Sequence, residues 1–509
     1  MSLIRIEKLT FAYPGSLDNV FENADIQIDT DWKLGFVGRN GRGKTTLMRL
    51  LMGEFKNEYE GRITGSVIFD YFPYKVKDTE MMTRYALGEI CPDAQDWEIA
   101  KELSYLDVDT DVLWRSFKTL SEGEKTKVLL AALFLNPGHF LLIDEPTNHL
   151  DLHGREVVAS YLNRKKGFIL VSHDRHFLDN CVDHILSINK ANIGVQKGDF
   201  STWLKEFEER QQAEIEENIR LGKDIRKLRE SARQKEDWSN KIEKTKIGGF
   251  DKGYIGHMSA KMMKRSVILR DRREKAIEEK SKLLKNAEFE QELKIHSVPY
   301  HTKRMAELIR VSVRYDEKEI NAPVSFTIEQ GDRIFLDGVN GAGKSSLLKL
   351  LLGKPVDYSG QLIRGSNLKI SYVTQDTSFI AGKLTDYARI RGIDETLFLT
   401  ILQKMGFMRT QFEKDMSEFS AGQKKKVLLA ASLSEKANLY VWDEPLNYID
   451  IYTRRQLEKL ITEYQPAMIM VEHDKAFRDA VATDVITVKK IRDPSSSGYH
   501  DSFNSKERV

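Results

Sequence analysis

The feature that most constrains the fold of this chain is an internal repeat: four short motifs occur twice, in the same order and in nearly constant register. The string at 38–45 fits the pattern GxxxxGK[ST] and recurs at 338–345, at an offset of 300 residues. The other pairs, at offsets of 299 or 300 residues, are SEGE at 121–124 with SAGQ at 420–423, LIDEP at 142–146 with VWDEP at 441–445, and His-Asp at 173–174 with His-Asp at 473–474. Constant register over four motifs predicts two homologous domains of about 190 residues each.

The length of 509 residues and the positions of the repeats predict the domain organisation. We expect a first domain at 1–199, a linker at 200–297, a second domain at 298–492 and a short disordered tail at 493–509. With 41% hydrophobic and 31% charged residues, the composition is that of a soluble globular protein. No apolar run approaches the roughly 20 residues that span a bilayer, and we expect no signal peptide. The two cysteines lack a CxxC spacing, which argues against a disulfide framework or metal cluster and favours the cytoplasm.

Each GxxxxGK[ST] string follows an apolar strand-like run and precedes a helical run, which is the context of a phosphate-binding loop. Glycines let backbone N–H groups approach phosphate oxygens, and the following helix adds its N-terminal dipole. Lys44 and Lys344 suit the outer phosphates, and the hydroxyls of Thr45 and Ser345 suit Mg2+. The residues predicted to bind nucleotide are Gly38, Asn40, Gly41, Gly43, Lys44, Thr45 and Thr46, and their counterparts Gly338, Asn340, Gly341, Gly343, Lys344, Ser345 and Ser346.

Two acidic pairs and two histidines complete the chemistry of each repeat. An apolar strand ends in Asp144-Glu145 in the first copy and in Asp443-Glu444 in the second, so both carboxylates of a pair belong at the edge of a sheet beside the loop. The aspartates suit the metal, and the glutamates suit a general base that orients the attacking water. His173 and His473 also follow apolar strands, where they can donate hydrogen bonds to the transferred phosphoryl group.

These motifs resemble those of the ATP-binding cassette (ABC) ATPases, whose LSGGQ signature stands here as LSEGE at 120–124 and FSAGQ at 419–423. The resemblance implies an α/β fold with two P-loop ABC cassettes in tandem that hydrolyse ATP with Mg2+. It also implies that the cassettes of one monomer pair head to tail, so that each nucleotide lies between one copy's loop and the other's signature. The first composite site then adds Ser420 and Gly422 to the first loop, and the second adds Ser121 and Gly123 to the second loop.

The family also places an aromatic residue on adenine and a glutamine near the metal. Tyr13 and Tyr315 stand where the aromatic is usual, with half-buried strand tyrosines as the alternative reading. Gln375 fits the metal-sensing glutamine, but Tyr74 takes its place in the first copy. The first site is therefore expected to couple metal to cassette closure differently.

The linker carries apolar stripes of helical spacing on either side of a glycine-rich stretch, which predicts a long antiparallel α-helical hairpin. Arms of about 40 residues would project roughly 60 Å. From 221 to 273 the chain has 16 Lys and Arg against 7 Asp and Glu, although the whole chain has a net charge of only +2. The tip near 244–258 combines basic and aromatic residues suited to phosphate contacts and base stacking. The residues predicted to contact RNA are Lys244, Lys246, Phe250, Lys252, Tyr254, His257, Lys261, Lys264 and Arg265.

Tandem cassettes, a basic helical linker and no membrane domain resemble the ABC-F proteins, and the stretch at 252–266 is similar to the linker of their ribosome-protection branch. The resemblance implies binding to the tRNA exit site of the bacterial 70S ribosome. There the linker would reach P-site tRNA and the 23S rRNA near the peptidyl-transferase centre, and displace pleuromutilin, lincosamide and streptogramin A antibiotics. Two alternatives stay open: a housekeeping ABC-F translation factor that acts on stalled ribosomes, and the fused ATPase subunit of an ABC importer.

Overall fold

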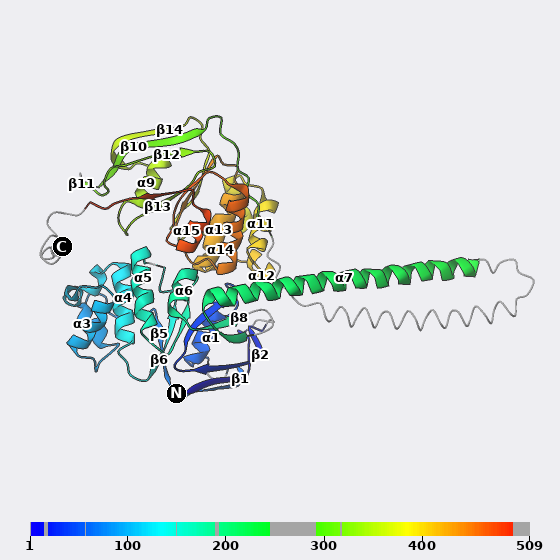
Figure 1. Cartoon of the computed structure of the whole chain (residues 1–509), viewed down its shortest axis with the longest axis horizontal. Coiled ribbons are helices and arrows are strands. Elements are labelled where there is room, and N and C mark those ends of the chain that lie inside the picture. The colour runs from blue at the N-terminus through cyan, green and yellow to red at the C-terminus, as the bar shows by residue number, and fades with distance from the viewer. Residues whose placement is uncertain are drawn as a thin grey trace, which may run out of the picture. The chain divides into compact units, whose positions relative to one another are not determined.

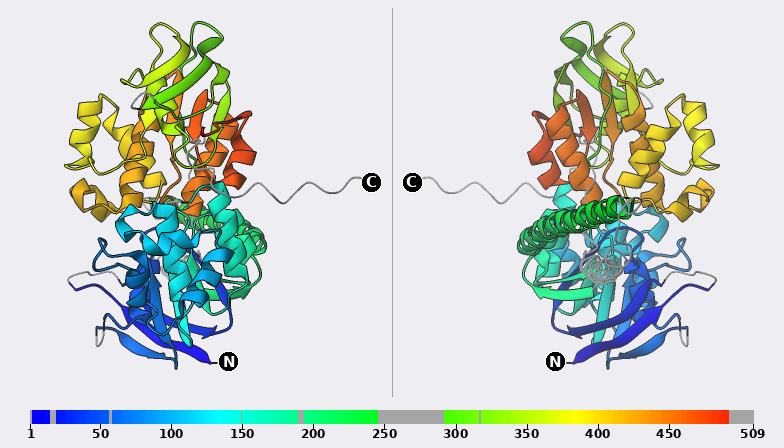
Figure 2. Two further views of the ribbon diagram at one scale, coloured as in Figure 1. Left: turned by 90° about the vertical axis from the view of Figure 1, so that its left-hand side faces the viewer. Right: turned by 90° about the vertical axis from the view of Figure 1, so that its right-hand side faces the viewer.

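The computed structural model describes residues 2–14, 19–55, 58–148, 150–188, 193–244, 292–315 and 318–491. The chain forms two compact units, Met1–Ser201 with Glu290–Val509, and Thr202–Phe289. The first unit contains both repeats, each folded as an α/β cassette (Figures 1 and 2). The α/β class and the two cassettes expected from the sequence are thus confirmed.

The first cassette is built on two sheets. A six-stranded sheet has the order β5-β6-β7-β3-β8-β9, parallel except for β9, and a three-stranded antiparallel sheet has the order β2-β1-β4. The strands are β1 (Leu3–Phe11), β2 (Phe21–Asp29), β3 (Lys33–Gly38), β4 (Glu60–Thr64), β5 (Ile68–Phe72), β6 (His139–Asp144), β7 (Phe168–Val171), β8 (His184–Ile188) and β9 (Ile193–Lys197). The helices are α1 (Lys44–Leu51), α2 (Thr83–Gly88), α3 (Asp96–Tyr105), η1 (Thr110–Trp114), η2 (Phe117–Thr119), α4 (Glu122–Leu133), α5 (Leu152–Asn163) and α6 (Arg175–Cys181).

The second cassette repeats this plan with a five-stranded parallel sheet of order β15-β16-β17-β13-β18 and a four-stranded antiparallel sheet. Its strands are β10 (Arg304–Tyr315), β11 (Lys318–Glu319), β12 (Val324–Glu329), β13 (Arg333–Asp337), β14 (Asp357–Arg364), β15 (Ile370–Val373), β16 (Leu439–Asp443), β17 (Met468–Val471) and β18 (Asp484–Thr487). Its helices are α9 (Lys344–Leu351), α10 (Leu384–Arg391), α11 (Glu395–Lys404), α12 (Arg409–Phe412), η3 (Met416–Glu418), α13 (Ala421–Ser434), α14 (Ile451–Tyr464) and α15 (Lys475–Val481).

The central strands are apolar along their whole length because helices or the second sheet cover both of their faces. Every residue of β7 and of β17 is buried. In the first cassette one apolar cluster joins α1 to the antiparallel sheet and to one face of β3, β6 and β7. In each cassette the central strands are parallel, so their carboxyl ends lie at one edge of the sheet, where the loop and the acidic pair follow.

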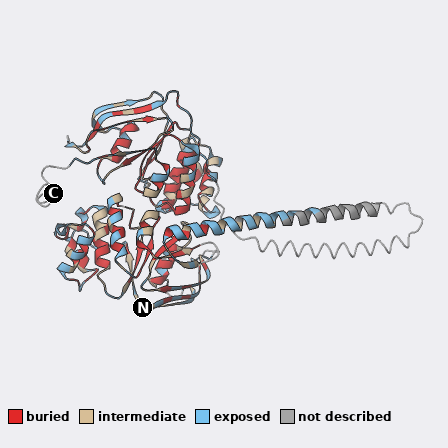
Figure 3. Ribbon diagram, viewed as in Figure 1, coloured by how far each residue is buried: buried red, intermediate tan, exposed pale blue. Residues whose placement is uncertain are grey.

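The helix α7 (Phe200–Lys244) leaves the first cassette and forms the described part of the second unit. Its first turn is held by Asp179, whose Oδ1 accepts from the Ser201 backbone N at 2.8 Å. The 45 residues of α7 correspond to about 65 Å of helix. Most of its described side chains are exposed (Figure 3). The predicted second arm of the hairpin, the tip from 245 onward and the tail at 493–509 lie outside the described residues, as does the side chain of Lys244.

Candidate functional site

The first phosphate loop runs from the end of β3 into α1, and its shape depends on glycine. Gly41 and Gly43 have φ of +82° and +93°, in the left-handed region that a side chain disfavours. A Cβ on Gly43 would also lie 2.5 Å from the Val20 side chain. The buried ammonium of Lys44 donates to the carbonyl of Gly38 at 2.6 Å, and burial lowers the pKa of Lys44.

The second loop has the same construction between β13 and α9. Gly341 and Gly343 have φ of +76° and +88°, and Lys344 donates to the carbonyl of Gly338 at 2.5 Å. In both loops the lysine ammonium donates to carbonyls of its own loop, and it can exchange these acceptors for phosphate oxygens when a nucleotide binds. The two predicted adenine-stacking tyrosines hold matching places next to these helices. Tyr13 bonds Thr46 at 2.8 Å and Tyr315 bonds Ser346 at 2.9 Å, each between side-chain hydroxyl oxygens, and both rings are exposed.

The predicted metal ligands lie together at both loops. The Thr45 hydroxyl donates to Asp144 Oδ2 at 3.4 Å, and the Ser345 hydroxyl donates to Asp443 Oδ1 at 3.0 Å. Burial raises the pKa of both aspartates, in part offset by these hydrogen bonds and by the loop lysines. A hydroxyl beside a carboxylate offers the oxygen ligands that Mg2+ prefers.

In the first cassette the proposed base lies beside the predicted histidine. Glu145 Oε1 is 3.3 Å from His173 Nε2, and His173 Nε2 is also 3.3 Å from Asn40 Oδ1. Burial and the neighbouring Asp144 raise the pKa of Glu145 to about 8. Burial and Lys44 lower the pKa of His173 well below its usual value. Glu145 Oε1 and His173 Nδ1 are buried without a hydrogen-bond partner among the described residues, so the pair has capacity left for a ligand.

The first loop faces the signature of the second cassette across a cavity of about 880 Å³. Residues of both cassettes line it, and the predicted site residues among them are Tyr13, Asn40, Gly41, Gly43, Lys44, Thr45, Thr46, Asp144, Glu145, His173, Ser420 and Gly422. The Asn40 side-chain amide donates to the Tyr448 carbonyl at 2.9 Å, which joins the loop to the second cassette directly. Ser420 caps α13 by accepting from the Gln423 backbone N at 3.3 Å, so the N-terminus of this helix opens on the cavity.

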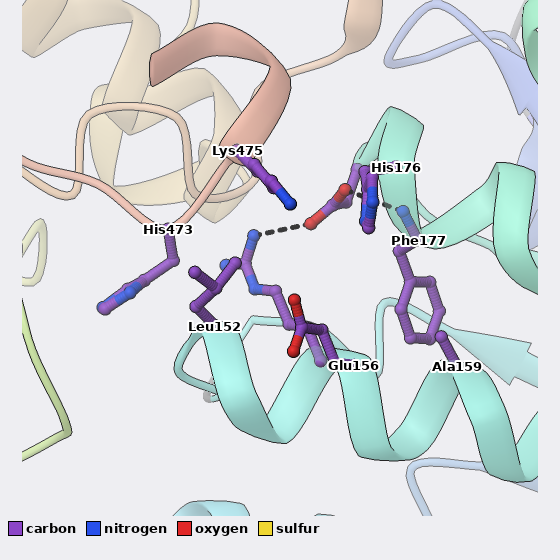
Figure 4. A pocket seen from close by; sticks show the side chains of 9 residues that line it. Leu152, Glu156, Ala159, His176, Phe177, His473 and Lys475 are labelled. Carbon is purple, nitrogen blue, oxygen red and sulfur yellow. Dashed lines mark hydrogen bonds and ion pairs between the residues drawn. The ribbon is translucent and has the colours of Figure 1, made fainter. Parts of the chain in front are cut away.

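The second loop is approached by a different residue of the first cassette. The Asn340 backbone N donates to Asp151 Oδ2 at 3.3 Å. Hydrogen bonds from the Gly154 and Asn340 backbone N–H groups hold the pKa of Asp151 low, although burial alone would raise it. His473 projects beside Leu152 of the first cassette (Figure 4), and burial together with Lys344 and Arg155 lowers the pKa of His473 to about 3. Ser121 caps α4 through Glu124, and its role at the second site, like that of Gly123, stays a prediction.

The second proposed base, Glu444, is held by two side-chain amides. Gln375 Nε2 donates to Glu444 Oε2 at 2.7 Å, and Asn447 Nδ2 donates to the same oxygen at 2.6 Å. Burial, then Glu472 and Asp443, raise the pKa of Glu444 to about 7. The glutamine predicted to sense metal therefore contacts the base in this structure.

Several residues of the site were not singled out by the sequence analysis. The Tyr71 hydroxyl donates to Asp144 Oδ2 at 2.9 Å, so the tyrosine that reaches the first metal position is Tyr71, while Tyr74 lines the cavity. Tyr448 has φ of +63°, in the left-handed region that is unfavourable for a bulky residue. Asp151 and Tyr448 each follow an acidic pair within a few residues, and this closeness in sequence was the one indication that they belong to the sites.

The residues present fit a nucleotide and its metal. The cavity is within the usual size range of ligand sites, the loop glycines leave its N–H groups accessible, and cationic, hydroxyl and carboxylate groups converge on it. In the described part of the chain, no helix is long and apolar enough to cross a membrane. Fold and site together define an ABC-type ATPase with two cassettes, which uses ATP and Mg2+.

Comparison with known proteins agrees with this class. A family model described as ABC transporter matches residues 21–148 and 322–447. The chain is 30% identical to the ATP-binding protein Uup of Caulobacter vibrioides, over 92% of this chain and 74% of that protein. It is 27% identical to the ribosome protection protein VmlR of Bacillus subtilis (92% and 84% covered). It is also 27% identical to the energy-dependent translational throttle protein EttA of Haemophilus influenzae (89% and 86%). The chain therefore belongs to the ABC-F family.

Among solved structures, the archaeal ribosome recycling factor aABCE1, in complex with the ribosomal stalk protein aP1, is similar in fold. The TM-score is 0.61 at 18% identity, and the match covers 95% of this chain and 89% of that one. At this identity the likeness shows a shared fold of two cassettes.

Proposed function

We propose that this protein is a cytoplasmic ribosome-binding ATPase that acts as a monomer and displaces antibiotics from the bacterial 70S ribosome. The observation that carries the proposal is the cavity at which the loop of one cassette meets the signature of the other. It lies in the same chain as a basic linker that begins with α7. Such a chain can convert cassette closure into movement of a projecting element.

We assign the residues of each site by their contacts. Lys44 and Lys344 are placed to neutralise phosphate oxygens, and Asp144 and Asp443, with their hydroxyl partners, are placed to hold the metal. Mg2+, when bound, neutralises charge on the phosphate oxygens. Glu145 and Glu444 orient the attacking water, and their raised pKa values suit a base that works near neutral pH. His173 and His473, held neutral by burial, donate hydrogen bonds to the phosphoryl group.

Cassette closure follows from the composite site. Ser420 and the N-terminus of α13 complete the site only when the second cassette lies against the first loop, so bound nucleotide stabilises the closed pair. Loss of the outer phosphate removes the negative charge that both the first loop and the N-terminus of α13 bind, which favours separation of the cassettes. Ser121 and Gly123 have the corresponding role at the second site.

The linker is the proposed ribosome contact. Its net charge of +9 between 221 and 273 suits rRNA and tRNA phosphates, and the family members VmlR and EttA are named for ribosome protection and translational throttling. We place the linker at the tRNA exit site, with its tip against P-site tRNA and 23S rRNA. The tip residues named above lie outside the described part of the chain, apart from the backbone of Lys244.

The test of the ATPase cycle is the double variant Glu145→Gln with Glu444→Gln. Removing both bases blocks hydrolysis while nucleotide still binds, so the closed form should accumulate on ribosomes. We expect at least a tenfold lower turnover and a several-fold larger fraction that sediments with 70S ribosomes in ATP. Sedimentation that is the same as for the unmodified protein would contradict the proposed coupling.

Antibiotic displacement is tested by a susceptibility panel in a sensitive bacterium that expresses the chain. Protection predicts resistance to chemically unrelated drugs that share one ribosomal site, and replacement of 244–257 by a Gly/Ser stretch should abolish it with ATPase activity retained. The second candidate, a housekeeping translation factor, is favoured by the similarity to EttA. It predicts no resistance and a growth or translation defect when the protein is removed.

A further inference from the structure

The two cassettes differ in charge at two buried positions behind their ATP sites. In the second cassette Lys425 on α13 and Glu472 after β17 are 1% and 5% exposed. At the same positions in the repeat, 299 and 300 residues earlier, the first cassette has Thr126 and Ser172. Two neutral hydroxyl residues are thus replaced by two opposite charges in the interior of one cassette.

Lys425 joins the loop that carries Gln375 to the strand that carries the acidic pair. Its ammonium donates to the Thr374 carbonyl at 2.9 Å and to the Asp443 carbonyl at 3.2 Å. Because Thr374 directly precedes Gln375, this contact fixes the backbone from which the Gln375 amide reaches Glu444. A buried ammonium needs such hydrogen-bond partners.

Glu472 holds the other side of the same base. Its Oε2 accepts from the Leu446 backbone N at 3.0 Å, and Leu446 directly precedes Asn447, whose amide also donates to Glu444. In the first cassette the matching contact is a bond of 3.3 Å between the Thr147 and Ser172 hydroxyls. Glu145 Oε1 has no hydrogen-bond partner among the described residues, and Tyr74 stands where Gln375 is in the second cassette.

We infer that Lys425 and Glu472 are positioning residues of the second ATP site, two buried residues of opposite charge whose backbone contacts hold Gln375 and Asn447 in place on Glu444. This inference rests on the proposed role of Glu444 as the base of that site. Neither residue touches nucleotide, so both act through the two amides. These two residues make the sites unequal, because they preorganise the base of the second cassette through its two amides.

The experiment replaces the pair by the residues of the first cassette, Lys425→Thr with Glu472→Ser, in full-length protein that carries Glu145→Gln to silence the first site. We expect kcat to fall about tenfold with KM changed less than twofold, because a looser base affects the chemical step and not nucleotide binding. The matched control is the exposed Lys436→Thr in the same background, which should leave both constants unchanged.

A second arm separates positioning from a general loss of structure. If the pair acts through the amides, the same exchange made in a Gln375→Ala, Asn447→Ala background should lower kcat by less than twofold, because the clamp is already absent. A tenfold loss in that background, or no loss of kcat in the first arm, would overturn the inference. Failure of the proposed function would give a different result, namely unchanged ATP turnover in the double variant Glu444→Gln with Glu145→Gln.

Discussion

At the scale of single residues, burial decides the chemistry of both sites. The base carboxylates and the histidines lie in the interior, where the cost of burial outweighs the opposite charges near them, so the uncharged form of each is favoured. Protonated glutamate and neutral histidine can coexist there without a net charge in the nucleotide-free protein. Nucleotide and metal, which bring their own charges, then change these protonation states on binding.

This arrangement predicts a pH dependence of stability in protein free of nucleotide and divalent metal. The folded pKa of Glu444 is raised to about 7, so between pH 4.5 and 7 the folded state binds more protons than the unfolded state. The free energy of unfolding must therefore fall as pH rises through this window. Glutamine does not titrate, so Glu444→Gln should stabilise the protein at pH 8 more than at pH 5, by about 2 kcal/mol.

Urea unfolding at the two pH values measures the effect. The exposed Glu463→Gln on α14 serves as control, because water keeps its carboxylate solvated in both states. If Glu444→Gln changes stability equally at pH 5 and pH 8, the carboxylate does not carry the raised pKa in the folded state.

At the scale of secondary-structure elements, the sequence predicted the parts whose contacts are local. The loop glycines, Lys44 and Thr45 form one continuous stretch with α1, so their arrangement follows from the motif itself. Contacts between distant segments could not be predicted this way. The bonds of Tyr71 to Asp144 and of Asn40 to Tyr448 join residues 73 and 408 positions apart, and nothing local in the sequence fixes them.

One such contact gives a prediction for the first turn of α13. A Cβ on Gly422 would lie 2.5 Å from the Tyr448 carbonyl and 3.1 Å from Asn40 Nδ2, and a backbone carbonyl cannot yield without moving its segment. We therefore expect Gly422→Ala to displace the Tyr448 segment, whose carbonyl accepts the hydrogen bond from Asn40 of the first loop, and to lower kcat at least tenfold in steady-state ATPase assays. Gly194→Ala on β9, where a Cβ meets nothing within 4 Å, is the control. Unchanged turnover in Gly422→Ala would argue that catalysis does not need this close approach.

At the scale of the whole molecule, charge is distributed unevenly. The net charge of +2 is the sum of +9 for residues 221–273 and −7 for the rest of the chain, so the positive charge is concentrated in the linker. The first cassette (1–199) has 24 Lys and Arg against 30 Asp and Glu, and the second (298–492) has 29 against 25, so their net charges of −6 and +4 attract weakly and specific pairs across the interface determine how they meet. Arg175 on α6 and Glu458 on α14 form one such pair, with 3.0 Å between Nη2 and Oε2.

Substitutions of the Arg175–Glu458 pair test cassette association in the intact chain. Its side chains are 18% and 26% exposed, so water screens the attraction only in part, and a contribution of about 1 kcal/mol is expected. Arg175→Glu places two carboxylates together and should lower ATP turnover several-fold, and adding Glu458→Arg should restore most of it by reversing the pair. The control is Arg389→Glu, whose partner Asp386 lies on the same helix α10, so cassette association should be unaffected. A reversed pair that is no more active than Arg175→Glu alone would mean that this contact does not support the association on which the composite sites depend.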